Sequence, residues 1–282
     1  MDGLQHRANF LLHNAVTDNT RQTYNTSLNA FERFRCKYKL PGFWPIPEQH
    51  LIWFLAYCHE SNCASSTVRT YISGINFHHK IRGFSNILDN FAVNKMLEGY
   101  ARVKPQVKDA RRPITKLILT AIADVLHLVC YNLYESKLFR AIFTLAYFGL
   151  FRISELVAPG KACLCNQARV QDIQVSPDAS FVSVTLVKSK TSQSGPPITL
   201  KIPREKQGIC PVRALQDYLA VAPTRAAAFS HKNGKPVTRT QVTAVLQKCL
   251  SRTGYNAPFF QSHSFRIGRA TDLSARGYQP LP

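Results

Sequence analysis

The sequence predicts a mainly α-helical protein of the α+β class, in which a helical bundle precedes a larger part with one small β-hairpin. Three observations predict it. Apolar residues recur at helical spacing through the first hundred residues, a basic segment with prolines follows, and two stretches of two-residue period lie beyond it. A chain of 282 residues is long enough for two domains that each bury a core.

The first part of the chain is predicted to contain four helices with short connections, which is typical of a compact bundle. The first helix opens near Thr17 or Asp18, and its apolar residues recur every three or four positions from Tyr24 to Tyr38. The next three are expected around residues 51–58, from the Ser65–Ser66 cap, and from about Asn90. We therefore expect a helical domain over residues 1–104.

A basic segment follows, which we interpret as a linker over residues 105–113. Pro105 and Pro113 discourage a helix there. A run of basic residues is often only a solvated surface, but in a chain this basic it favours a segment that lies along phosphates. The candidate DNA-binding residues in this linker and just before it are Arg102, Lys104, Lys108, Arg111 and Arg112, and Lys188, further along the chain, is another.

The remaining part, residues 114–282, has a mixed pattern. Two strands with alternating apolar residues are expected at 181–187 and 198–202, and the polar turn KSKTSQSGPP between them makes a hairpin with a basic loop. Helices are expected at 114–132, 138–157, 211–221, 239–252 and 264–276.

The charge balance points to a polyanionic partner. Lys and Arg number 36 against 16 Asp and Glu, a net charge of +20, and nucleic acid is the commonest partner of so basic a protein. The longest apolar run, from Ala141 to Phe151, is far shorter than the roughly 20 residues of a membrane span, so no membrane partner is expected. The first residues do not resemble a signal peptide, which predicts a nuclear or cytoplasmic rather than a secreted protein.

The cysteines do not suggest a structural or metal-binding framework. The chain has eight of them, none in a CxxC pair, and several fall in apolar helical patterns. We therefore expect reduced thiols, with no disulfide framework and no zinc site.

One motif places charge inside an apolar helix. In GLFRISEL, Arg152 and Glu155 interrupt a very hydrophobic stretch. A guanidinium in that setting is costly unless it is paired or faces an anion. Both interpretations stay open from these residues: a structural pair at i, i+3 spacing, or an anion site.

Two further motifs are weak by themselves. LVKSKT puts Lys188 and Lys190 at the mouth of the predicted hairpin, where lysines are usually only solvated. SHSFRIGRAT puts His263 and Arg266 one helical turn apart, which also occurs by chance at a polar helix start.

In this order, however, the three motifs resemble the tyrosine recombinase (phage integrase) family. The family's pattern is an Arg in an RxxE-like helix, a Lys on a β-hairpin, and HxxR on a later helix. The resemblance covers nearly the whole chain and implies a helical core-binding bundle followed by a tyrosine recombinase catalytic domain. The variant SHSFRIGRAT, together with SKT, is most similar to recombinases of eukaryotic DIRS-type mobile elements.

The resemblance implies a role for each residue. Arg152 and Arg266 would clamp the non-bridging oxygens of a DNA phosphodiester, a role that needs no metal or other cofactor. Lys190, with Lys188 as the alternative, would protonate the departing 5′-oxygen, and His263 would assist proton transfer at the attacking oxygen. Glu155 would hold Arg152 or His263 in place. Implied partners are double-stranded DNA and further copies of the chain, as dimers or tetramers on DNA.

The family's nucleophilic tyrosine is expected some 30 to 35 residues after His263, beyond Pro282, where the given sequence stops. Tyr278 lies too close to the motif to serve, and Tyr255 precedes it. The sequence therefore predicts a form that binds and polarises a phosphate without forming the covalent link.

Two alternatives remain open. One is a non-catalytic regulator that occupies recombination sites or pairs with a full-length copy. The other is a type IB topoisomerase, which uses a similar residue set; the short helical N-terminal part favours a recombinase.

Overall fold

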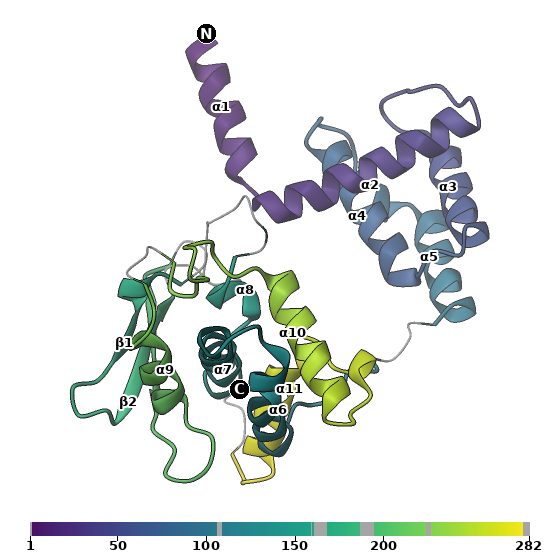
Figure 1. Cartoon of the computed structure of the whole chain (residues 1–282). Helices are drawn as coiled ribbons and strands as arrows, with labels where there is room; N and C mark the ends of the chain where they lie inside the picture. The colour runs from purple at the N-terminus through teal and green to yellow at the C-terminus, as the bar shows by residue number, and fades with distance from the viewer. Residues whose placement is uncertain are drawn as a thin grey trace. The chain divides into compact units, whose positions relative to one another are not determined.

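The computed structural model describes residues 2–105, 109–158, 160, 168–186, 195–223 and 227–278. The chain divides into two compact units, unit 1 over Met1–Asp109 and unit 2 over Ala110–Pro282 (Figure 1). In the part of the chain that the structure describes, no helix is long and apolar enough to cross a membrane.

Unit 1 is helical. Its helices are α1 (Asp2–Asn14), α2 (Asp18–Lys37), α3 (Glu48–Glu60), α4 (Ser65–Lys80), the short 3₁₀ turn η1 (Ile87–Asp89) and α5 (Phe91–Val103). The four predicted helices correspond to α2, α3, α4 and α5, and Thr17 caps α2 by accepting a hydrogen bond from the Thr20 backbone. Helix α1 was not predicted.

The core of unit 1 is rich in aromatic rings. Phe31 and Phe34 of α2 meet Phe54 of α3 with ring centroids 5.2 and 5.4 Å apart. Gly74 of α4 lets that helix approach α2 closely, because a Cβ there would lie 2.5 Å from the Cβ of Ser27. The helical periodicity of the sequence therefore identified the residues that hold this unit together.

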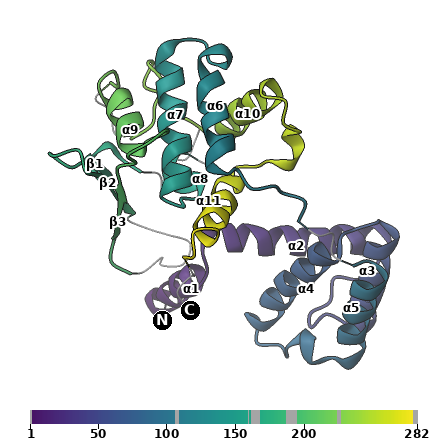
Figure 2. The ribbon, with the colours of Figure 1, turned by 90° about the horizontal axis from the view of Figure 1, so that it is seen from below.

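Unit 2 combines helices with one small sheet (Figure 2). Its helices are α6 (Lys116–Val129), α7 (Leu133–Phe148), α8 (Ile153–Leu156), α9 (Pro211–Leu219), α10 (Arg239–Arg252) and α11 (Ser264–Ser274), with 3₁₀ turns η2 (Val170–Asp172) and η3 (Ala257–Phe259). Its strands β1 (Ile173–Val175), β2 (Phe181–Leu186) and β3 (Ile198–Pro203) form an antiparallel sheet in the order β1-β2-β3. The mainly helical α+β class is confirmed.

The predicted hairpin is present, with Val182 opposite Ile202 and Thr185 opposite Thr199. The sheet also contains β1, which the sequence did not indicate because three residues are too few to show a two-residue period. The side chains of Val182, Val184 and Ile202 are buried against the helices of unit 2.

One predicted helix is wrong. Instead of a single helix over 138–157, α7 ends at Phe148 and the short α8 begins at Ile153. Between them Leu150 adopts a left-handed conformation, φ 53°, and a Cβ at Gly149 would lie 2.2 Å from the ring of Phe151. The continuous apolar pattern hid this break, because residues on both sides of it are buried.

Candidate functional site

The break after α7 places Arg152 at the start of α8. Its backbone N–H donates to Glu155 Oε2 at 2.8 Å, and its Nη1 donates to Glu155 Oε1 at 3.0 Å. The Arg152 side chain is 32% exposed and that of Glu155 is 11% exposed. The pair expected from the sequence therefore exists, and it fixes a guanidinium that still has an open side.

His263 and Arg266 lie at the start of α11. His263 is the capping residue, and its carbonyl oxygen accepts from the Arg266 N–H at 3.1 Å. Phe265 between them is buried and stacks on Phe143 of α7, with ring centroids 5.2 Å apart. This packing anchors the first turn of α11 to the helix that precedes α8.

The backbone around Ile114 lies directly against α11. The Ile114 N–H donates to the Ser264 carbonyl at 2.9 Å, and a Cβ at Gly268 would lie 1.7 Å from the Ile114 oxygen. Only a residue without a side chain allows this approach. Arg111, three residues before Ile114, lies at the site.

These segments enclose a small cavity of about 180 Å³. Its lining residues are Arg111, Arg152, Ile153, Ser154, Arg239, Ser262 and His263. The lining includes three arginines, one histidine and two serines, and no aspartate or glutamate is among these described residues. Such a cavity is suited to an oxyanion of phosphate size.

The electrostatics of Arg266 support this view. Burial, followed by the positive charge of Arg152, lowers the pKa of the Arg266 guanidinium, while Glu155 acts in the opposite direction. Two cations held near each other in a partly buried place repel, and a bound anion relieves that repulsion. Arg152, Glu155 and Arg266 thus form one electrostatic group.

Arg239 is a cavity residue that sequence reasoning missed. It is the first residue of α10, and its N–H donates to the Ala158 carbonyl at 2.9 Å. Thr238 and Gln241 form a capping box that fixes the helix start. The TxxQ pattern signals that helix start, but only the pairing with Ala158, shortly after α8, places Arg239 beside Arg152.

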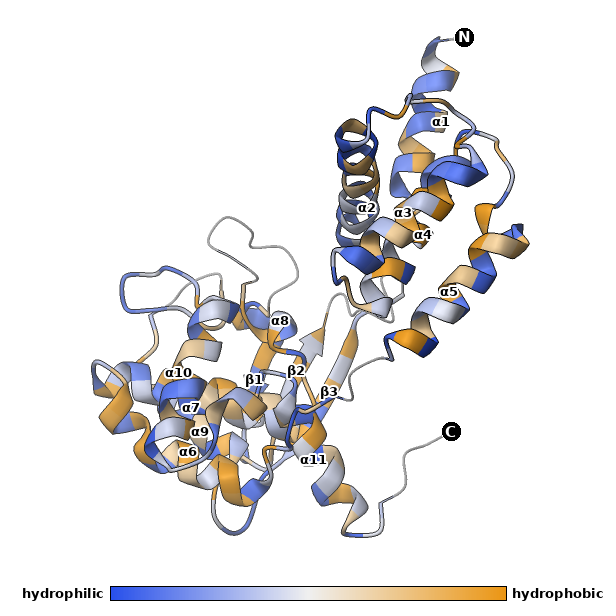
Figure 3. Cartoon of the chain, turned by 90° about the vertical axis from the view of Figure 1, so that its right-hand side faces the viewer, coloured by the Kyte–Doolittle hydropathy of each residue, from blue (hydrophilic) through white to orange (hydrophobic). Residues whose placement is uncertain are grey.

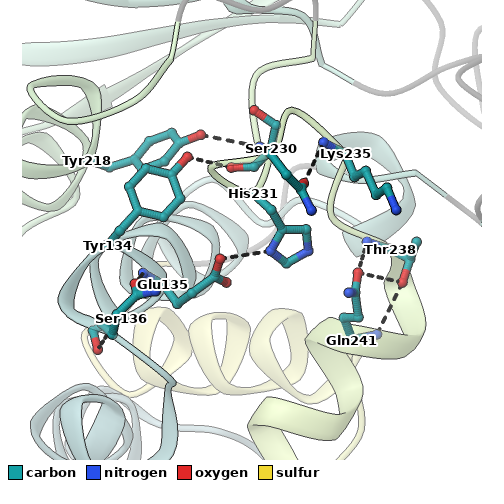
Figure 4. A network of polar contacts seen from close by, with 11 residues as sticks. Tyr134, Glu135, Ser136, Tyr218, Ser230, His231, Lys235, Thr238 and Gln241 are labelled. Atoms are coloured by element: carbon teal, nitrogen blue, oxygen red, sulfur yellow. Dashed lines mark hydrogen bonds and ion pairs between the residues drawn. The ribbon is translucent and has the colours of Figure 1, made fainter.

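A polar network holds the segment that leads into α10 (Figure 4). The Tyr218 hydroxyl donates to the Ala228 carbonyl at 3.0 Å, and the Tyr134 hydroxyl donates to the Ser230 carbonyl at 2.5 Å. The ring of His231 lies 2.8 Å from Glu135, measured from Nδ1 to Oε1. These contacts tie residues 228–231 to α7 and α9 and so fix the direction from which Arg239 approaches.

The predicted basic residues are not all brought together. Arg111 lines the cavity, whereas Arg112 stacks on Phe259 at 4.8 Å from the ring centroid. Arg102 and Lys104 belong to unit 1, where Lys104 Nζ donates to the Asn62 carbonyl at 2.7 Å.

Three candidate lysines lie outside the described residues: Lys108, Lys188 and Lys190. Strand β2 ends at Leu186, before the hairpin loop, and strand β3 begins at Ile198, after it. Within the described residues no group of three or more His, Cys, Asp or Glu side chains is arranged to hold a metal ion.

The fold of unit 2 is that of a tyrosine recombinase catalytic domain. The whole chain is similar to the Tn1549 transposon integrase in complex with a circular intermediate DNA, with a TM-score of 0.61 and 14% identity, over 98% of this chain and 88% of that one. No family model and no curated protein matches the sequence.

Two further solved structures are similar. One is a lambda integrase dimer bound to a COC′ core site, with a TM-score of 0.62 and 14% identity, covering 97% of this chain and 69% of that one. The other is the XerH site-specific recombinase bound to difH substrate, with a TM-score of 0.56 and 14% identity, covering 90% and 69%. All three are DNA complexes, and at this level of identity the likeness establishes the fold.

Proposed function

We propose that this protein binds double-stranded DNA as a tyrosine recombinase, with unit 2 as the catalytic domain and unit 1 as the core-binding domain. The arginine-lined cavity carries the proposal. It brings Arg152 and His263, which are 111 residues apart in the sequence, to one place of phosphate size. The similarity of the chain to three DNA-bound recombinases supports it.

In this proposal the residues act on one phosphodiester. Arg152 and Arg266 hold the non-bridging oxygens and stabilise the charge that builds up in the transition state. Glu155 orients Arg152 through the two hydrogen bonds described above. His263 assists the attacking oxygen, and Lys190, with Lys188 as the alternative, protonates the departing 5′-oxygen. The class of reaction is DNA strand cleavage and exchange, as in recombination and integration.

Further parts of the proposal rest on the sequence motifs. The SHSFRIGRAT and SKT variants favour a recombinase of eukaryotic mobile elements, and hence a nuclear protein. The basic residues Arg102, Lys104, Lys108, Arg111 and Arg112 would lie along the DNA backbone. The lambda integrase neighbour is a dimer on its DNA, which supports self-association on DNA here.

A salt titration of duplex binding tests the proposal. Fluorescence anisotropy with a labelled duplex should show that log K falls steeply with log salt, by roughly 0.9 for each phosphate neutralised. The double variant Arg152→Ala/Arg266→Ala should reduce that slope by about 1 to 2. The control Arg276→Ala removes an exposed arginine after the end of α11.

Three results would count against the proposal. Affinity that does not weaken between low and moderate salt would rule out a phosphate-directed interface. Equal losses in the double variant and in Arg276→Ala would rule out the clamp. Relaxation of supercoiled DNA without site preference would point instead to a type IB topoisomerase.

A further inference from the structure

The end of helix α3 holds two cysteines in one tight turn. Cys58 lies in the last turn of α3, and Cys63 is the second residue after the capping residue Ser61. The Cys63 N–H donates to the Cys58 carbonyl at 3.0 Å, and the Asn62 N–H donates to the His59 carbonyl at 3.0 Å. Asn62 is left-handed, with φ 57°. These features define a Schellman motif, in which the side chains of the first and sixth residues commonly make contact.

The turn brings the two cysteines within the range of a disulfide. A single hydrogen bond joins the Cys58 oxygen to the Cys63 nitrogen, so the two Cα atoms lie less than about 7 Å apart. Disulfide-bonded cysteines have Cα separations of about 4.4 to 6.8 Å. Cys63 also packs against the buried cluster that contains Cys58. Both cysteines are free thiols in this structure, as the sequence predicts.

Helix α5 fixes the same turn. The Tyr100 hydroxyl shares its hydrogen between the Cys58 carbonyl, at 3.1 Å, and the Cys63 carbonyl, at 2.8 Å. Lys104 Nζ donates to the Asn62 carbonyl at 2.7 Å. Figure 3 shows hydrophobic residues on both α3 and α5, which pack on each other in unit 1. Because three carbonyls of the turn are held by α5, the two thiols stay neighbours.

The two thiols differ in exposure, and this difference sets the order in which they react. Cys58 is 1% exposed, whereas Cys63 is partly exposed and within reach of a small oxidant. Burial, followed by the neighbouring Cys63, raises the pKa of the Cys58 thiol to about 12. A buried neutral thiol reacts poorly with an oxidant in solution, because the thiolate is the nucleophile. Cys63 is therefore the thiol that meets the oxidant first.

We propose that Cys58 and Cys63 form a reversible oxidation site, which hydrogen peroxide converts into a disulfide. The Cys63 sulfur attacks the peroxide, so that an S–O bond forms and the O–O bond breaks. The departing hydroxide takes the Cys63 proton, and the products are a sulfenic acid and one water. The Cys58 sulfur then attacks the Cys63 sulfur, the S–S bond forms and the S–O bond breaks. The second hydroxide leaves with the Cys58 proton as water, so two thiols are oxidised and one peroxide is reduced.

The disulfide ties the end of α3 to the start of α4. Ala64, the residue after Cys63, is the capping residue at the start of α4. Since α5 holds the same turn, oxidation makes one point of the contact among these three helices covalent, and a thiol reductant releases it. The inference concerns unit 1 alone and does not rest on the proposed function. Its test uses no DNA, so the two proposals fail independently.

Mass spectrometry of the full chain after treatment with hydrogen peroxide tests the site. The remaining free thiols are alkylated, and the chain is unfolded and cleaved after glutamate. Glu60 lies between Cys58 and Cys63, so a disulfide between them keeps the two fragments together. We expect a joined fragment that lacks two hydrogen atoms and that a thiol reductant separates.

Two variants and one control separate the roles of the cysteines. Cys63→Ser should lose the joined fragment entirely. Cys58→Ala should stop at the sulfenic acid, so that dimedone, which traps this acid, labels Cys63 far more than in the wild type. The matched control Cys36→Ser removes an exposed thiol of unit 1 and should form the joined fragment like the wild type. Circular dichroism checks the fold of Cys58→Ala; if that variant does not fold, the wild type and Cys63→Ser decide by the joined fragment.

The proposal is overturned by any of three outcomes. The first is a wild-type chain whose two fragments separate without reductant after peroxide treatment. The second is equal dimedone labelling of Cys63 in the wild type and in folded Cys58→Ala. The third is a folded Cys36→Ser variant that no longer forms the joined fragment, since the disulfide would then depend on Cys36.

Discussion

Each unit contains an arginine paired with a glutamate three residues away, and the two arginines differ in their surroundings. In unit 1, Arg35 lies 3.2 Å from Glu32, donates to the Phe43 carbonyl at 2.9 Å and sits 4.6 Å from the centre of the Phe31 ring. That arginine is 1% exposed. In unit 2, Arg152 is paired in a similar way but remains open to the cavity.

The difference shows that a charge pair in the sequence does not reveal its role. The two terminal nitrogens of Arg35 and the flat face of its guanidinium contact its own unit, which makes it a structural residue. Arg152 is fixed on one side by Glu155 and faces other cations on the other. Like charges kept close together are costly for folding and are typical of a ligand site.

The largest expected effect tests how unit 2 is assembled. Gly268→Ala should destabilise unit 2 by about 3 kcal/mol or unfold it, because the new Cβ would overlap the Ile114 backbone. Both tryptophans, Trp44 and Trp53, are in unit 1. Chemical denaturation followed by circular dichroism should therefore show the loss, while tryptophan fluorescence stays as in the wild type. A parallel shift in both signals would mean that the units unfold together.

Two single substitutions test whether Arg35 and Arg152 have different roles. Arg35→Ala should lower the stability of unit 1 by about 2 to 3 kcal/mol, because it removes buried packing and a hydrogen bond, and should leave the salt dependence of DNA binding unchanged. Arg152→Ala should reduce the salt dependence of DNA binding and leave the stability of its unit nearly unchanged. Thermal melting measures the stability of both variants, and anisotropy titrations measure their salt dependence. If the two variants change alike in both measurements, Arg35 and Arg152 do not differ in role.

A smaller effect is expected at the start of α10. Arg239→Ala should weaken duplex binding by about tenfold and reduce the salt slope by about 1, since one phosphate contact is lost. Arg252→Ala, at the far end of the same helix and about 20 Å away, is the control. If both variants behave alike, Arg239 contributes only to the general positive charge.

Acid should affect unit 1 through two histidines. Burial lowers the pKa of His50 and of His78, so their neutral forms are favoured in the folded state. As the pH falls below about 6.5 the unfolded chain takes up protons first, so the stability that is complete above this pH decreases below it. Tryptophan fluorescence melts between about pH 7.5 and 5.5 should show this. The double variant His50→Gln/His78→Gln should be less sensitive to pH, whereas the control His59→Gln, at an exposed position, should behave like the wild type.

The smallest effect is expected from a glycine with open space around it. In α5, a Cβ at Gly99 would meet no atom within 4 Å. Gly99→Ala should therefore stabilise unit 1 by about 0.5 to 1 kcal/mol, through helix propensity and a less flexible unfolded chain. Gly74→Ala in the same unit should destabilise it, because Ser27 is in the way. Urea titrations of both variants measure the contrast.

Much of unit 1 could be predicted because its information is local. The spacing of apolar residues from Tyr24 to Tyr38 follows the face of α2 that packs on α3 and α4. Helix α1 escaped prediction because none of its described residues is buried, and an apolar pattern alone says little about an exposed helix.

The sequence by itself determined the helical class, the hairpin strands, the positive charge and the residue types of the candidate site, since these depend on local periodicity and composition. Tertiary structure decided that helix α7 ends at Phe148. It also decided that Arg152 and Arg239 line the same cavity. The physical reason is separation along the chain. Local patterns record which face of an element is apolar, whereas the approach of residues a hundred positions apart depends on backbone contacts such as that between Ile114 and Gly268.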